Sequence, residues 1–265
     1  MTEQLVVKYQ AQKKKLLPLR KISTLFLFFI ISSSVLAYPV SFEAVLQKGE
    51  DFFSRRYLDS TYTDSAYQLL AAARPQYPDD EHGLALWSQV GIEMGDDAIR
   101  NADKIAYYTI AQHAAETLKM INSDNPAGHF WWASAYGMVG LTQGTLNALF
   151  RVPAVKNELK MTLELDSNFV LAYAILGILY RELPAVVGGD FAVSRYYFET
   201  GLARDSTFTL LRLELARLEI KEGHWAAAHQ QLEELLATEK PRYQAAFVMN
   251  DQPEALKLLA EIKNK

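Results

Sequence analysis

Residues 168–182 read NFVLAYAILGILYRE, and residues 190–201 read DFAVSRYYFETG. In the first stretch an aromatic residue, a Leu-Gly pair and a second aromatic residue recur at helical spacing, at Tyr173, Leu176, Gly177 and Tyr180. The second stretch has small and aromatic residues at a compatible spacing, at Ser194, Phe198 and Gly201. Because small residues let two helices approach closely, the two stretches predict one tightly packed helix–turn–helix pair.

Similar patterns lie on both sides of this pair. They occur at Trp87, Val90, Gly91 and Met94, at Ala133, Tyr136, Gly137 and Gly140, and across two helices at Leu215, Ala216, Glu219, Ala228, Leu232 and Leu235. The repeat positions are separated by 46, 40 and 39 residues, which exceeds the 34 residues of a tetratricopeptide repeat. We expect the additional residues to lie in the turns. An irregular all-helical domain is the alternative interpretation.

Apolar periodicity, prolines and glycines together divide the chain into helices. The expected ranges are 41–56, 61–74, 81–94, 101–121, 127–143, 153–165, 168–182, 190–204, 207–222, 224–237 and 251–263. The predicted fold class is therefore all-α: a tetratricopeptide-like solenoid of about five helix pairs with a C-terminal capping helix.

Composition excludes several classes of protein. The chain has 265 residues, half of them hydrophobic, so it is long enough to bury a core and too apolar for a disordered protein. It has no cysteine, which excludes disulfide scaffolds, zinc ribbons and iron–sulfur sites. The net charge of −4 argues against a nucleic-acid partner.

The charge is unevenly distributed along the chain. Residues 1–37 contain six basic side chains and one acid, which leaves 21 basic and 30 acidic residues in 38–265. The basic cluster precedes a short apolar run and small residues ending at Ala37, a pattern typical of a secretory signal peptide. We therefore expect a leader over 1–37, a repeat domain over 38–265 and a periplasmic location. The alternative is an uncleaved inner-membrane anchor over 22–37, which would be the chain's one membrane contact.

Several motifs between residues 127 and 236 resemble the T component of tetratricopeptide-associated TRAP transporters. They are Trp131-Trp132, Leu165-Asp166, Tyr173 with Leu176-Gly177, Pro184 with Gly188-Gly189-Asp190, and Tyr197-Phe198-Glu199. The resemblance implies a periplasmic helical-repeat protein that binds a solute-binding protein and helps pass a hydrophobic or organic-acid solute to a permease. The chain lacks the lipid-attachment cysteine of many members. A general envelope scaffold or assembly factor without a small ligand is the alternative function.

The first helix of each pair is expected to line the concave face of the solenoid. The repeat motif identifies the side of each first helix that packs against its partner helix. The residues on the other side are expected to face a groove, and most of them are apolar. The candidate groove residues are Trp131, Ser134, Met138 and Leu141, then Leu171, Ala174, Ile178 and Arg181, and finally Leu210, Leu213 and Arg217. Two arginines in an apolar groove would suit a hydrophobic ligand with a carboxylate, although packing and ion pairing explain the same residues.

The sequence contains no motif for catalysis, for a metal or for a cofactor. The five histidines form no metal-ligating pair, and His224 and His229 are five residues apart rather than four. The Gly188-Gly189-Asp190 segment lacks the Lys-Ser/Thr of a phosphate-binding loop, so Asp190 is expected to cap a helix. We therefore predict a non-enzymatic protein with no catalytic residue, no metal ligand and no cofactor.

Overall fold

The structure, a computed structural model, describes residues 41–265, and the predicted leader over 1–37 lies outside the described residues. Every regular element within 41–265 is helical, which confirms the all-α prediction. The helices are α2 (Phe42–Ser54), α3 (Tyr62–Ala73), α4 (Glu81–Asp97), α5 (Asn101–Ile121), α6 (Pro126–Gln143), α7 (Thr145–Leu165), α8 (Val170–Glu182), α9 (Phe191–Arg204), α10 (Thr209–Glu222), α11 (Trp225–Leu236), α12 (Gln244–Ala246) and α13 (Gln252–Ile262). Short turns lie at η1 (Arg74–Gln76), η2 (Ala185–Val187) and the π-helical η3 (Phe247–Asp251).

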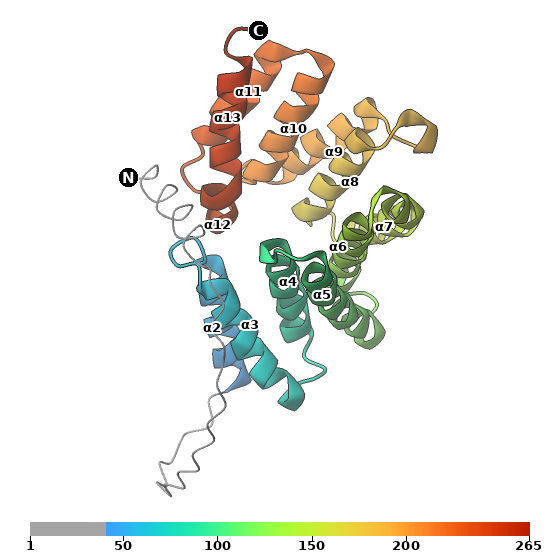
Figure 1. The fold of residues 1–265 in the computed structure, drawn as a ribbon, viewed down its shortest axis with the longest axis vertical. Helices are drawn as coiled ribbons and strands as arrows, with labels where there is room; N and C mark the ends of the chain where they lie inside the picture. Colours follow the sequence, from blue (N-terminus) through green and yellow to red (C-terminus); the bar gives the residue numbers. More distant parts are fainter. Residues whose placement is uncertain (1–40) are drawn as a thin grey trace, which may run out of the picture.

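The helices form five consecutive antiparallel pairs, from α2–α3 to α10–α11, and the pairs stack into a curved superhelix (Figure 1). Helix α13 packs on α11, the second helix of the last pair. Its buried face joins the core of that pair through Ala255, Leu258 and Ile262. Both the number of pairs and the capping helix agree with the prediction. No helix in the part of the chain that the structure describes combines the length and hydropathy needed to cross a bilayer.

Small residues let helices α8 and α9 approach closely, as the motif predicts for this pair. A Cβ atom placed on Gly177 of α8 would lie 2.3 Å from the ring of Phe198 on α9, so only glycine fits at this contact. The hydroxyl of Ser194 on α9 donates a 2.8 Å hydrogen bond to the carbonyl of Gly177. At the start of α9 the Asp190 carboxylate accepts hydrogen bonds from two backbone amides, which confirms its role as the N-cap.

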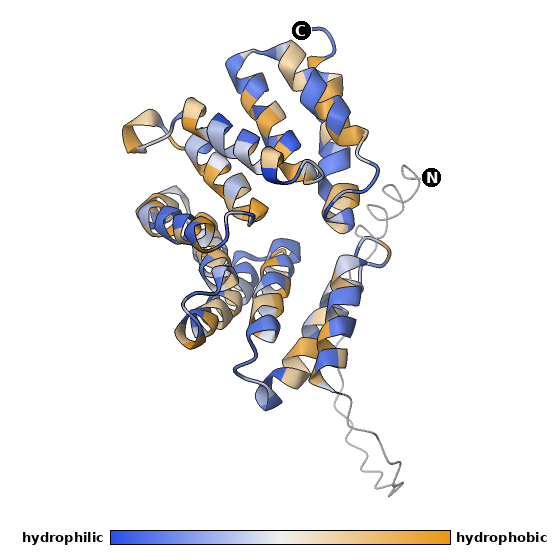
Figure 2. Cartoon of the chain, turned by 180° about the vertical axis from the view of Figure 1, so that it is seen from behind, coloured by the Kyte–Doolittle hydropathy of each residue, from blue (hydrophilic) through white to orange (hydrophobic). Residues whose placement is uncertain are grey.

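Apolar and polar residues alternate along most of the helices (Figure 2). Helix α10 is buried on several sides, with Leu211, Leu213, Leu215 and Leu218 all in the core. The apolar side chains form successive core clusters along the stack, whose fully buried members include Leu118, Leu159, Leu176, Leu211 and Leu232. The α8–α9 loop is an exception, because it is apolar yet projects from one edge, with Val186 93% exposed.

Two expectations about the lengths of helices and turns are wrong. Helix α7 begins at Thr145 instead of residue 153 and contains Pro153 in its interior. Contacts with α6 hold the two extra turns, because Arg151 donates to the carbonyl of Tyr136 at 3.0 Å and covers its ring at 4.1 Å. The additional residues of the second and third repeats therefore lie in long helices and not in turns; only the α8–α9 loop lengthens a turn as expected.

The C-terminal segment is longer than predicted and closes the superhelix. Helical structure begins at Gln244 rather than at 251, and passes through the π-helical η3 into α13. Tyr57, in the α2–α3 turn, packs against Ala245 and Met249 of this segment. In Figure 1 the red α12 accordingly lies next to the blue end of the first pair. The first and the last parts of the repeat domain are therefore in contact.

Candidate binding groove

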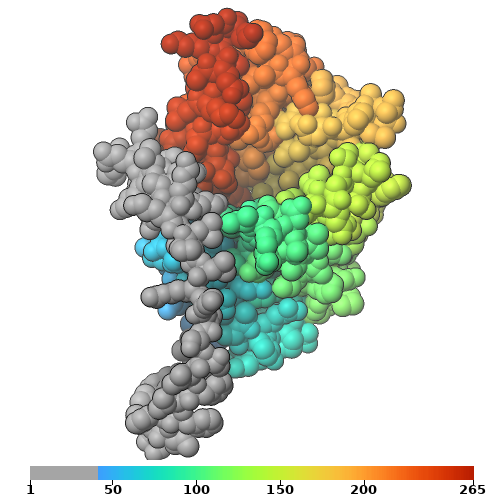
Figure 3. Space-filling view, viewed as in Figure 1, coloured from blue at the N-terminus to red at the C-terminus, as the bar shows by residue number. Residues whose placement is uncertain are grey.

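The curved stack encloses a groove of about 1260 Å³. Every first helix of the five pairs contributes to its wall, together with the C-terminal segment from residue 241 to 257; representative lining residues are Gln47, Gln89, Trp131, Leu171, Leu213, Tyr243 and Met249. Figure 3 shows the orange and red C-terminal arm facing the blue and green N-terminal helices. The expectation that first helices line the concave face therefore holds for all five pairs.

The structure brings some of the predicted groove residues together and places the others elsewhere. Trp131, Leu213 and Arg217 line the groove, as do Leu171 and Leu210. The remaining candidates, which are not part of its wall, are Ser134, Met138, Leu141, Ala174, Ile178 and Arg181. Leu141 is 63% exposed, and Ala174 is fully buried. The assignment of any of these residues to partner binding stays a prediction.

Both candidate arginines are engaged in ion pairs with the protein's own glutamates. Arg181 is buried between Glu182, at 2.7 Å, and Glu214, at 2.5 Å. Arg217 contacts Glu214 at 2.5 Å and Glu254 of α13 at 3.2 Å. The positive charges that suggested a carboxylate ligand are therefore already neutralised inside the repeat domain.

Two aspartates on the groove wall were not recognised from the sequence. Asp96, at the end of α4, accepts a 2.6 Å hydrogen bond from the Tyr108 hydroxyl, and Asp251, at the end of η3, accepts one of 2.6 Å from Thr209. Burial raises the pKa of each carboxyl to about 6, although the hydroxyl donor lowers it. Both aspartates are therefore mostly ionised at neutral pH and mostly protonated in mild acid.

The sequence carried a partial signal for these residues. The apolar run from Ala245 to Met249, which ends two residues before Asp251, could have indicated an additional helical turn on the groove side. Asp96 gave no such signal, because Gly95-Asp96-Asp97 has the composition of a turn and yet continues α4.

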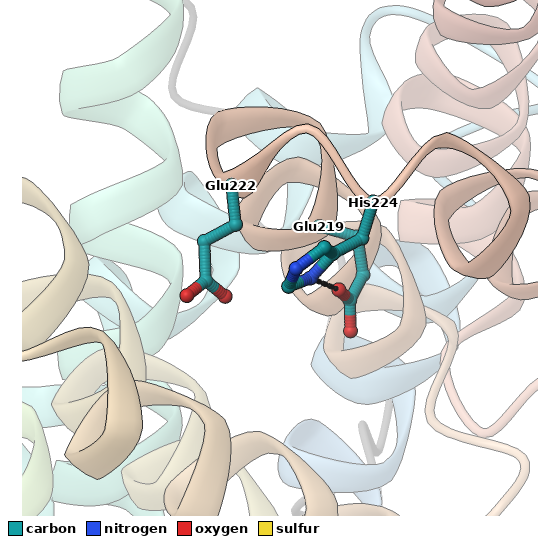
Figure 4. A group of neighbouring side chains, drawn as sticks. All are labelled: Glu219, Glu222 and His224. Atoms are coloured by element: carbon teal, nitrogen blue, oxygen red, sulfur yellow. Dashed lines mark hydrogen bonds and ion pairs between the residues drawn. The ribbon is translucent and has the colours of Figure 1, made fainter.

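A second cluster of charged groups lies where α10 turns into α11. Glu219, Glu222 and His224 place one potential metal-ligand atom each within 4.8 Å of the others (Figure 4). The guanidinium of Arg195 on α9, however, pairs with both glutamates, at 2.6 Å for Glu222. Burial raises the pKa of Glu219, but the hydrogen bonds from Arg195 and His224 outweigh it and lower that pKa. We interpret the cluster as an ion-pair network that joins the fourth and fifth helix pairs.

Comparison with solved structures agrees with the repeat fold. The crystal structure of TTC0263, a thermophilic TPR protein of Thermus thermophilus, matches with a TM-score of 0.63 and 16% identity, over 84% of this chain and 97% of that chain. PilF of Pseudomonas aeruginosa matches with a TM-score of 0.51 and 17% identity, over 84% of this chain and 92% of that chain. At these identities the likeness concerns the fold alone, and it is that of a tetratricopeptide-repeat protein.

Sequence comparison gives a family. No curated protein sequence matches the chain significantly. The family described as regulator of microtubule dynamics protein 1-3 (RMD1-3) matches residues 51–184, from within α2 to just after α8. Because this match covers half of the chain, the protein belongs to the RMD1-3 family.

Proposed function

We propose that the protein is a non-enzymatic scaffold that holds a segment of a partner protein in its groove. The observation that carries this proposal is the groove itself, because all five first helices and the C-terminal segment contribute to one wall. Its volume of about 1260 Å³ exceeds the roughly 300–1,000 Å³ of a typical small-molecule pocket. An extended or helical peptide segment would fill such a space and would cover its apolar side chains.

Site-specific photo-crosslinking in the native cell tests this function. A photoreactive phenylalanine analogue would be placed at one of two positions. Gln47 is exposed and lines the groove, whereas Tyr196 is 61% exposed on α9, the second helix of the fourth pair. We expect a defined protein adduct from position 47 and none from position 196. Equal adducts from both positions, or none from either, would contradict the proposal.

The resemblance to the T component supports a more specific partner. We propose a solute-binding protein of a TRAP-type transporter, met in the periplasm after export through residues 1–37. Mass spectrometry of the adduct from position 47 identifies the partner, and fractionation with sequencing of the mature N-terminus identifies the compartment. An adduct with an unrelated assembly protein, or a cytoplasmic chain with an intact N-terminus, would favour the general scaffold over the transport accessory.

A small apolar or carboxylated ligand has less support from the geometry. A carboxylate needs a cation in the groove, and Arg217, the groove arginine expected to supply it, pairs with Glu214 and Glu254. Quenching of tryptophan fluorescence by long-chain fatty acids, compared between wild type and Trp131→Phe, measures this alternative. Saturable quenching in the wild type that is lost in Trp131→Phe would support a small ligand in the groove.

A further inference from the structure

The charged residues of the groove wall are not balanced. Four basic side chains line the groove, and each of them already has an acidic partner: Arg56 with Glu93, Arg217 with Glu214 and Glu254, Arg242 with Asp205, and Lys257 with Glu254. Six acidic side chains line the same groove. Four of them contact a basic group: Glu50 with His82, Asp51 with Arg55, Glu93 with Arg56, and Glu254 with Arg217.

The other two acids, Asp96 and Asp251, have a hydroxyl donor and no ion pair within residues 41–265. Asp251 is only 3% exposed. The charged groups near Asp96 are Glu93, Asp97 and Lys104, and those near Asp251 are Glu214 and Arg217. Only Lys104 and Arg217 favour the ionised forms, and Arg217 is already shared between two glutamates. Asp251 is a desolvated carboxylate without a cation, which is costly, so a cation that enters the groove would stabilise it. Asp96 is exposed on the groove wall, where a cation from outside the chain can reach it.

The two aspartates come from opposite parts of the wall. Asp96 lies at the C-terminal end of α4 in the second pair, whereas Asp251 belongs to the C-terminal segment. The C-terminal end of a helix carries a partial negative charge, which adds to that of Asp96. Apolar side chains, among them Trp131, Leu171 and Leu213, line other parts of the same groove. The groove thus combines apolar surface with uncompensated negative charge.

From this charge pattern, and on the basis of the proposed function, we propose that the groove binds a partner segment that is apolar and positively charged. Its lysine or arginine side chains pair with Asp96 and Asp251, and its apolar side chains contact the wall around Trp131 and Leu213. A segment with carboxylates is disfavoured, because every lining cation would have to exchange an internal partner for it.

Panning of a phage-displayed library of random peptides against the full chain tests the proposal. The protein variants are the wild type, the Asp96→Asn/Asp251→Asn double variant and Glu199→Gln. Asparagine keeps the shape and the oxygen that accepts the hydroxyl hydrogen bond, so folding, checked by circular dichroism, is retained. Glu199 is an exposed acid on α9 outside the groove and serves as the matched control.

We expect the wild type and Glu199→Gln to select peptides enriched in lysine or arginine next to apolar residues. The same peptides should bind the double variant at least roughly tenfold more weakly, which is a modest loss for two charge pairs of which one, at Asp251, is desolvated. Selected peptides that are neutral or acidic, or basic peptides that bind the double variant equally well, would overturn the charge inference and leave the groove as a binding site. If no variant selects any peptide, both the inference and the proposed function are contradicted.

Discussion

The contact between Gly177 and Phe198 gives a sharp test of how the repeat motif holds the helices together. We predict that Gly177→Ala destabilises the protein. A Cβ atom at position 177 would approach three ring atoms of Phe198 to 2.3, 2.5 and 2.8 Å. Phe198 is fully buried, so its ring has no free space to move into. Overpacking of this kind costs about 1–3 kcal/mol.

The net effect follows from two opposing contributions. Three sub-contact distances to a buried ring place the overpacking cost near the upper end, at about 3 kcal/mol. Replacing glycine by alanine inside a helix recovers about 1 kcal/mol. We therefore expect a loss of about 2 kcal/mol in the free energy of unfolding, which corresponds to a decrease of roughly 4–8 °C in Tm for a domain of this size.

Gly137 provides a matched control, since it holds the same motif position in α6. Its added Cβ would meet one atom, Val155 Cγ2, at 3.7 Å, which is an ordinary contact. Gly137→Ala should therefore raise the unfolding free energy by up to about 1 kcal/mol through helix propensity. In a Phe198→Leu background, Gly177→Ala should cost much less unfolding free energy than it does in the wild type, because the smaller leucine leaves room for the added Cβ atom.

The measurement is urea unfolding followed by circular dichroism, with thermal unfolding as a second observable. Opposite signs for the two glycine substitutions would confirm that the close approach is specific to α8 and α9. The reasoning is refuted if Gly177→Ala and Gly137→Ala change the unfolding free energy alike, within about 0.5 kcal/mol.

Three further predictions concern the groove and its closure. Because the folded-state pKa of Asp251 is raised from 3.8 to about 6, its stabilising contribution is present below pH 4 and is lost as pH rises to 6. Asp251→Asn should therefore stabilise the protein at pH 7 by up to about 3 kcal/mol and flatten the unfolding free energy measured between pH 4 and 7. Arg181→Ala should cost about 3 kcal/mol in urea unfolding, because it removes a partner of the buried Glu214; a loss below 1 kcal/mol would contradict this. Tyr57→Ala removes the contact with Ala245 and Met249, so limited proteolysis should cleave the segment around residue 245 faster than in wild type, with unchanged cleavage speaking against closure.

The sequence predicts most of the fold because the decisive signals are local. The small residue in each motif, such as Gly177, and the helix cap at Asp190 act within one helix pair, and both are where the spacing puts them. Helix boundaries fail where a contact between helices overrides a local signal. Pro153 looked like a helix start, but Arg151 ties the preceding turns of α7 to Tyr136 of α6.

The candidate site was only partly predictable, because groove composition depends on the curvature of the whole stack. Helical phase alone placed Trp131, Leu213 and Arg217 on the groove wall. It could not show that the C-terminal segment folds back to the α2–α3 turn, since this contact joins Tyr57 to Met249 across almost the full length of the repeat domain. That segment contributes a large part of the groove wall and one of its two unpaired acids.

The expected charge of the ligand shows most clearly how contacts between distant residues change a prediction made from the sequence. Read along the sequence, Arg217 is a candidate cation in an apolar groove and would suit a ligand with a carboxylate. In the folded chain Glu254, on a helix that only closure brings near, pairs with it at 3.2 Å. Asp96 is the opposite case. Its segment, Gly95-Asp96-Asp97, has the composition of a turn, but α4 continues through it and places the Asp96 carboxylate on the groove wall. Neutralised arginines and unpaired aspartates together reverse the expected ligand from an acid to a cation, and this reversal follows from contacts between distant residues rather than from any residue alone.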